Sequence, residues 1–122
     1  MATFSKEIPS GSTSGRGIKV AATATAGTLI HTAVAGASDK DEIWVYAVNN
    51  SGSDVILSLE WGGVTPIDDL ITTPIPSYSG LVLVAPGLLL NGGLIVRAFV
   101  GLPGPIAANV VTIFTYVNRI TA

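Results

Sequence analysis

Hydrophobic and polar residues alternate along several short stretches of this chain, with the two-residue period of a β-strand. The strongest stretch, Glu42–Asn49, divides into two faces: Ile43, Val45 and Ala47 on one, and Trp44, Tyr46 and Val48 on the other. Both faces are apolar. Since one face can pack in the core of the domain, the other needs a second cover.

A second alternating stretch, Asp54–Trp61, follows directly after the turn residues Asn50–Ser53. Two alternating runs joined by a short polar turn are typical of a β-hairpin. We therefore expect these two strands to pair with each other.

The most apolar segment, Gly80–Val100, contains too many Gly, Pro and Asn residues and an arginine to form a transmembrane or buried helix. The same interruptions divide it into pieces with the length of short strands. We predict strands at Gly80–Ala85, Leu88–Leu90 and Leu94–Val100, with turns at Pro86-Gly87 and Asn91–Gly93.

Further strands are predicted at Ile18–Thr25, Thr28–Val34 and Asn109–Asn118, with a short extended piece near Leu70–Thr72. About eight short strands with frequent turns predict an all-β fold, a single-domain β-sandwich or jelly roll of antiparallel strands. The sandwich should span residues 18–122.

Residues 1–17 are rich in Ser and Gly and are predicted to form an extended N-terminal arm. We expect the arm to dock either on a neighbouring subunit or back on its own domain, with Phe4 and Ile8 as apolar anchors. The start of the chain has no apolar core of the signal-peptide type, so we expect neither secretion by that route nor a membrane partner.

The composition indicates a surface that other protein chains cover. Of 122 residues, 48% are hydrophobic and 11% are charged, against about 25% in an average protein. The net charge of −2 argues against a nucleic-acid partner, and the absence of cysteine excludes disulfides and thiolate metal sites.

Candidate chemistry is sparse. His31 is the single histidine and lies within a predicted strand, so we interpret it as a surface or packed strand residue. Asp39, Asp41 and Glu42 form an acidic turn that does not match a calcium-binding loop. We expect no catalytic residue, no cofactor and no metal.

Four further charged residues need an interpretation. Asp68 and Asp69 are adjacent, and neighbours on an extended segment point apart, so we expect them to cap a turn. Glu60 and Arg97 are single charges in apolar strands, and buried charges are tolerated mainly in pairs. Our hypothesis is that these two meet across the sandwich or across a subunit boundary.

Aromatic residues are the remaining candidates for a site. Six of them could form a core, a protein interface or a sugar-binding face: Trp44, Tyr46, Trp61, Tyr78, Phe114 and Tyr116. We interpret them as core or interface residues, and with Phe4 and Ile8 they are the predicted protein-interface residues.

Several segments together resemble a family of small structural proteins from tailed-bacteriophage virions. They are TFSKEIPSGSTSGRGIKVAATAT, IHTAV, DEIWVYAVNNSGSDVILSLEWGG, PSYSGLVLVAPGLLLNGGLIVRAF and YVNRIT, and they span nearly the whole chain. The resemblance is to capsid cement or decoration proteins, and it implies β-sandwich modules that form trimers on the head and bridge neighbouring major capsid proteins.

The leading expectation is therefore a non-enzymatic virion protein, made in the host cytoplasm, that forms a homo-oligomer, with a trimer favoured, on a phage head. A second is a carbohydrate- or receptor-binding jelly-roll module of a phage tail or neck, which would use Trp44, Trp61 and Tyr78 on glycan. An enzyme would require a pocket that joins His31 to Asp68 or Asp69.

Overall fold

The structure is a computed structural model that describes residues 2–122, so Met1, the first residue of the predicted arm, lies outside the described residues. The described residues form nine strands: β1 (Thr3–Glu7), β2 (Ile18–Lys19), β3 (Thr28–Thr32), β4 (Lys40–Asn49), β5 (Val55–Trp61), β6 (Leu70–Ile75), β7 (Val82–Leu90), β8 (Ile95–Val100) and β9 (Val111–Thr121). Within this range there is no helix long and apolar enough to cross a membrane.

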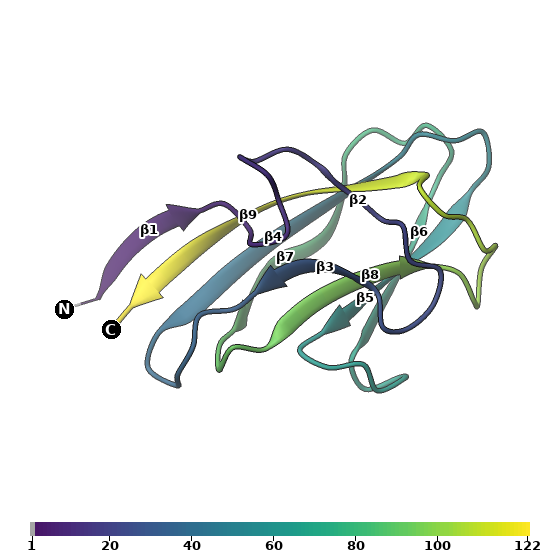
Figure 1. The fold of residues 1–122 in the computed structure, drawn as a ribbon. Helices are drawn as coiled ribbons and strands as arrows, with labels where there is room; N and C mark the ends of the chain where they lie inside the picture. Colours follow the sequence, from purple (N-terminus) through teal and green to yellow (C-terminus); the bar gives the residue numbers. More distant parts are fainter. Residues whose placement is uncertain (1) are drawn as a thin grey trace.

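The strands form two antiparallel sheets that lie as layers of a sandwich (Figure 1). Sheet A has the strand order β1-β9-β4-β7, with β2 also paired to β9, and sheet B has the order β3-β8-β5-β6. The two ends of the chain lie side by side, because β1 pairs with β9 from Thr3 opposite Thr121 to Glu7 opposite Val117. The predicted all-β sandwich is confirmed.

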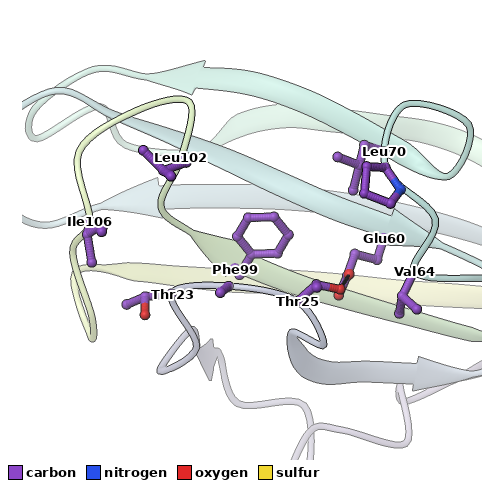
Figure 2. A pocket seen from close by; sticks show the side chains of 10 residues that line it. Thr23, Thr25, Glu60, Val64, Leu70, Phe99, Leu102 and Ile106 are labelled. Atoms are coloured by element: carbon purple, nitrogen blue, oxygen red, sulfur yellow. Dashed lines mark hydrogen bonds between the residues drawn. The ribbon is translucent and has the colours of Figure 1, made fainter.

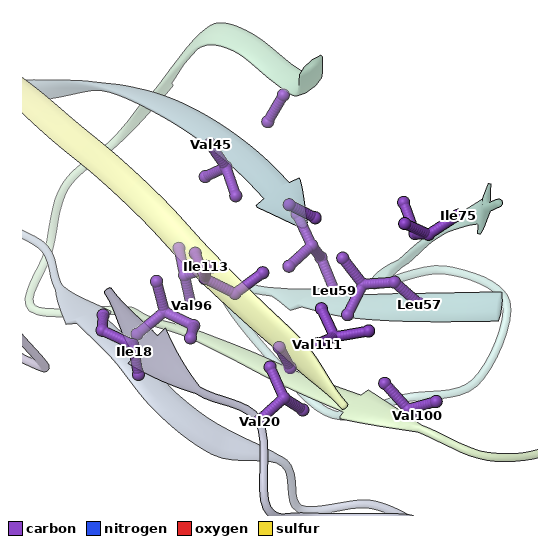
Figure 3. Close-up of a cluster of buried hydrophobic side chains, with 14 of the residues drawn as sticks. Ile18, Val20, Val45, Leu57, Leu59, Ile75, Val96, Val100, Val111 and Ile113 are labelled. Atoms are coloured by element: carbon purple, nitrogen blue, oxygen red, sulfur yellow. The ribbon is translucent and has the colours of Figure 1, made fainter. Parts of the chain in front are cut away.

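The core lies between the two sheets and follows the period-two alternation. Ile43, Val45 and Ala47 of β4 face Leu57 and Leu59 of β5 across it, and all five are fully buried. Figure 3 shows side chains from both sheets meeting in this layer. The sequence pattern grouped the side chains of β4 into two apolar faces, and the structure shows that the face of Ile43, Val45 and Ala47 is the one in the core.

The predicted pairing of β4 with β5 is wrong. The turn at Asn50–Ser53 crosses from sheet A to sheet B, so the two strands pack face to face and pair with other neighbours. Asn49 holds this crossing, because its side-chain amide donates to the carbonyl oxygens of Ser53 at 2.8 Å and Ile75 at 3.1 Å. The physical reason is that each strand buries more apolar surface across the core than a hairpin would.

The predicted turn at Pro86-Gly87 is also wrong. β7 runs continuously from Val82 to Leu90 along β4, with register shifts near this dipeptide. β7 is an edge strand, so Pro86 costs no ladder hydrogen bond there. Gly87 has φ = 73°, which only glycine adopts readily, and this permits the bulge.

Two other predicted segments take a definite form in the structure. The N-terminal segment, predicted to dock on a neighbouring subunit or back on its own domain, contains a strand, β1, that pairs with β9 at the edge of sheet A. The predicted strand Ile18–Thr25 ends after Lys19, and residues 21–27 form a strap that crosses to sheet B. The strap is anchored at β8, where the Val100 amide donates to the Ala22 carbonyl oxygen at 3.1 Å.

Candidate functional site

A buried polar network links the N-terminal segment to both sheets. Ser10 follows β1, His31 lies on β3 of sheet B, and Asp41 lies on β4 of sheet A. The Ser10 backbone amide donates to His31 Nδ1 at 3.0 Å, and His31 Nε2 lies 2.8 Å from Asp41 Oδ2. A nitrogen that accepts from an amide carries no hydrogen, so the imidazole hydrogen sits on Nε2 and is donated to Asp41.

Arg119 of β9 completes this network on the other side of Asp41. Its guanidinium donates to both Asp41 oxygens, at 2.8 Å and 3.0 Å, and lies 3.7 Å from Glu7. Burial by itself would raise the pKa of Asp41, but hydrogen bonds from Arg119, His31 and the Val34 amide outweigh it and lower that pKa below 3.8. The carboxylate is therefore held in its charged form.

The network contains the residue types of a serine hydrolase without the geometry for acyl transfer. A nucleophilic hydroxyl needs a histidine nitrogen that is free to accept its proton. The Ser10 hydroxyl lies 3.4 Å from His31 Nδ1, but that nitrogen already accepts from the Ser10 amide at 3.0 Å, and Ser10 Oγ itself accepts from the Thr32 amide at 2.6 Å. Both His31 and Asp41 are buried. The arrangement fixes the N-terminal segment against the sandwich, and His31 is a packed strand residue.

The other acidic residues predicted near this turn do not converge. Asp41 points inward, Glu42 points to the outer face of sheet A, and Asp39 accepts from the Ala122 amide at 3.0 Å. Asp69 caps a turn by accepting from the Thr65 amide at 3.0 Å. Across residues 2–122, no cluster of three His, Asp or Glu side chains has the arrangement of a metal site.

A pocket of about 360 Å³ lies on the outer face of sheet B (Figure 2). Its lining is mainly apolar and comes from the sheet, the strap and two loops: Thr23, Ala24, Thr25, Glu60, Val64, Pro66, Leu70, Phe99, Leu102 and Ile106. Glu60 is 0% exposed, because its carboxylate accepts from the Gly27 amide at 2.6 Å and from the Thr25 hydroxyl. This carboxylate, in the wall of the pocket, holds the strap on the sheet.

The hypothesis that Glu60 and Arg97 form an ion pair is wrong within the described chain. The two residues are directly opposite each other on β5 and β8, yet the salt bridges found in residues 2–122 do not include this pair. Glu60 bonds to the strap, and Arg97 lines a separate shallow hollow beside Gly62 and Leu94. The strap, which the sequence did not reveal, supplies the donors that the buried carboxylate requires.

The outer face of sheet A is an open surface with several exposed large hydrophobic side chains. We define it by the side chains that point away from the core on the strands of sheet A and at the residue before β7: Phe4, Lys6, Lys19, Lys40, Glu42, Trp44, Tyr46, Val48, Leu81, Leu83, Pro86, Leu89, Thr112, Phe114, Tyr116, Asn118 and Ile120. Trp44 and Tyr116 are cross-strand neighbours that stack with ring centroids 6.0 Å apart and an interplanar angle of 6°. Lys6 covers Tyr116, with its ammonium 4.9 Å from the ring centroid.

One end of this face is fixed by hydrogen bonds. Glu42 Oε1 accepts from Trp44 Nε1 at 2.7 Å and from the Asn118 amide at 2.9 Å. These two bonds, in that order of effect, lower the pKa of Glu42 below 4.5. The indole is thereby held in one orientation, with its N–H already satisfied inside the chain.

The structure brings together five of the eight predicted interface residues, on the outer face of sheet A: Phe4, Trp44, Tyr46, Phe114 and Tyr116. Trp61 packs against the core, while Tyr78 and Ile8 are exposed in other segments. The sequence analysis missed the β7 leucines. Leu81 and Leu83 alternate with Val82 and Val84, and this pattern signals a strand with two apolar faces.

Comparison with protein-family models, with curated proteins and with solved structures finds no match to this chain.

Proposed function

We propose that this protein is a non-enzymatic structural component of a tailed-phage virion, a cement or decoration protein that oligomerises and bridges neighbouring major capsid proteins on the phage head. The observation that carries the proposal is the open apolar and aromatic outer face of sheet A. Monomeric proteins rarely expose a continuous apolar patch of this kind, and larger patches mark interaction surfaces.

The charge distribution supports the same role. In the described chain His31 and Arg119 both bond to Asp41, so part of the small charged complement is used inside the domain. The surface that remains has little charge to keep it apart from other chains. A shell component needs cohesion, and such a surface favours it.

The N-terminal segment supports bridging. β1 is tied to β9 at the edge of sheet A, yet Phe4 is 74% exposed and Ile8 is 57% exposed. The network around Ser10 holds this segment in place, so its apolar side chains are presented without an ordering cost at the moment of binding. We assign these two residues to contacts with a shell partner.

One observation favours a second function, the carbohydrate- or receptor-binding module of a phage tail or neck. The stacked rings of Trp44 and Tyr116 present a flat aromatic surface next to the polar groups of Glu42 and Asn118. Flat aromatic faces beside hydrogen-bonding groups suit sugar rings. Trp61 and Tyr78 lie elsewhere, so a sugar site would use Trp44 with Tyr116.

Mass spectrometry of density-gradient-purified virions of the phage that encodes the chain, with immunogold labelling, tests the proposal. We expect the protein in intact particles, in copy numbers comparable to the major capsid protein, with gold on the head. Its absence from particles would overturn the proposal. Gold on the tail or neck, together with a glycan-array signal that Trp44→Ala abolishes, would establish the second function.

A further inference from the structure

We infer that the outer face of sheet A is the docking surface for a second copy of this chain, and that two such faces pack on each other about a two-fold axis. The inference deepens the proposed structural role and rests on it in one respect: both require this face to be covered. It commits to the second copy as the occupant, and the following features of the face support that choice.

The centre of the face carries few polar groups. Trp44 donates its single N–H to Glu42 inside the chain. Its neighbours Phe114, Leu83 and Pro86 have side chains without polar atoms, and Tyr46 and Tyr116 carry one hydroxyl each. Burying this region therefore removes mainly apolar area from water, and the two hydroxyls are the groups that the contact must leave hydrogen-bonded.

The charges of the face lie at its rim. Lys6, Lys40 and Glu42 lie at one end, and Lys19 of β2, opposite Thr112, lies at the β2 edge, while the centre at Trp44, Tyr46 and Phe114 carries none. Lysines at a rim can keep their ammonium groups in water, so a second copy buries no unpaired ion in the centre of the contact. A strongly charged partner would find no complementary charges in the centre of the face.

Shape and size also fit a second copy. Apolar sheets pack face to face with strands aligned within about 30°, because both share the same twist, and a second copy supplies an identical twist. Four strands spaced about 4.8 Å apart and rising about 3.3 Å per residue cover roughly 500 Å² in projection. Because side chains project from the sheet, the area that a partner buries exceeds this projected area and approaches the roughly 800 Å² per partner of a standard interface.

The face also offers a hollow for a side chain of the partner copy. A cavity of about 360 Å³ at the end of the face away from Glu42 is lined by Val48, Asn50, Gly80, Leu81 and Phe114. Exposed leucine side chains, such as Leu83 and Leu89, are the kind of group that fills an apolar hollow and anchors an interface. A face that pairs with itself closes at two copies, so this inference specifies a dimer where the family resemblance suggested a trimer.

Native mass spectrometry and light scattering of the full chain, over a range of concentrations, test the inference. We expect a dimer for the natural chain and at least about a tenfold rise in its dissociation constant for Leu83→Lys and for Phe114→Lys. The matched control is Leu102→Lys, which also places a lysine at an exposed leucine, on the sheet B side. The control should remain dimeric.

Three outcomes would overturn the inference: a natural chain that stays monomeric, a trimer, or face variants that dimerise like the control. Circular dichroism of each variant verifies that it is folded. The chain has no cysteine, so a spin label on Thr112→Cys, on the same face but not at an anchoring residue, marks one position per copy. The label-to-label distance should be shorter at position 112 than for Leu102→Cys, and the reverse order would also contradict the proposal.

The outcome for this inference is separable from that for the proposed function. A chain that is monomeric in solution but present on the heads of purified virions would retain the structural role and eliminate self-pairing through sheet A. A dimer that depends on Leu83 and Phe114 but is absent from virions would retain self-pairing through sheet A and eliminate the structural role in the virion.

Discussion

The outer faces of the two sheets both carry apolar side chains, but they differ in whether other segments of the chain cover them. On sheet B, Phe99 is 7% exposed, because the strap and the loop after β8 lie over the sheet. On sheet A, Phe114 occupies an equivalent outward position and is 40% exposed. Both sheets have two apolar faces, but only the outer face of sheet B is covered by segments of the chain itself.

The cover on sheet B depends on close backbone contacts. A Cβ atom at Gly101 would collide with the Thr23 carbonyl, and one at Gly104 would overlap Ile56. Glu60 then fixes the strap by accepting from Gly27. A strand with two apolar faces therefore predicts that something covers its outer face. The chain itself supplies this cover where small residues let a loop lie close against the sheet.

The largest expected effect comes from truncating the same residue type on the two faces. Phe99→Ala should lower the free energy of unfolding by about 3–5 kcal/mol, because it opens a cavity under the strap. In the dilute monomer, Phe114→Ala should cost less than about 1 kcal/mol, because water already reaches the ring. Urea unfolding measures both, and equal losses would contradict the difference between the faces.

Acid should weaken the link between the two sheets, which Asp41 makes by bonding to His31 of sheet B and Arg119 of sheet A. The folded pKa of Asp41 lies below the ordinary 3.8, so its contribution is complete above that value and is lost as the pH falls through the folded pKa. Asp41→Asn should cost about 2–3 kcal/mol at neutral pH. Its stability should also decline less between about pH 5 and acid than that of the natural chain.

Urea titrations at a series of pH values measure this effect. Asp68→Asn, at an exposed carboxyl, is the control and should follow the natural chain. An Asp41→Asn curve parallel to that of the natural chain would show that Asp41 is not the titrating group.

The strap on sheet B provides a smaller test. Glu60→Gln keeps the shape of the side chain but weakens the charge-assisted bonds from Gly27 and Thr25, and should cost about 1–2 kcal/mol. Hydrogen exchange should accelerate at the Gly27 amide. The control Glu7→Gln removes a carboxylate at the partly exposed rim of sheet A and should change stability by less than about 0.5 kcal/mol. Similar losses of stability for the two variants would contradict the conclusion that Glu60 holds the strap on sheet B.

The smallest effect is spectroscopic and concerns the open face of sheet A. Protonation of Glu42 removes an acceptor from Trp44, so Trp44 emission should change with a midpoint below 4.5. A Trp61→Phe background leaves Trp44 as the single reporter. Glu42→Gln should abolish the transition. A midpoint at or above 4.5, or a transition that survives in Glu42→Gln, would show that the emission change does not report the protonation of Glu42.

The candidate site was partly predictable from local pattern. Alternation placed Trp44 and Tyr46 together on one face of β4, and it did the same for Phe114 and Tyr116 on β9. That these strands are neighbours could not be read from the chain, because about 70 residues separate them and pairing across such a distance leaves no local signal.

The polar networks were hidden for a similar reason. Asp41 looked like part of an acidic turn, and its partners His31 and Arg119 lie on strands that meet it only after folding. Glu60 was correctly singled out as a buried charge, but the donors that satisfy it belong to the strap. A buried charge predicts that a partner exists, and the tertiary fold determines which one.

The sequence by itself determined the all-β class, the turns at Asn50–Ser53 and Asn91–Gly93, and which side chains of a strand such as β4 share a face, because these depend on residue type and on the two-residue period. Only the tertiary structure decided that the turn after β4 changes sheets and that β7 continues through Pro86. It also decided that one outer face is covered and the other open. These features depend on which strands come together, and burial across the core outweighs the local preference of a turn.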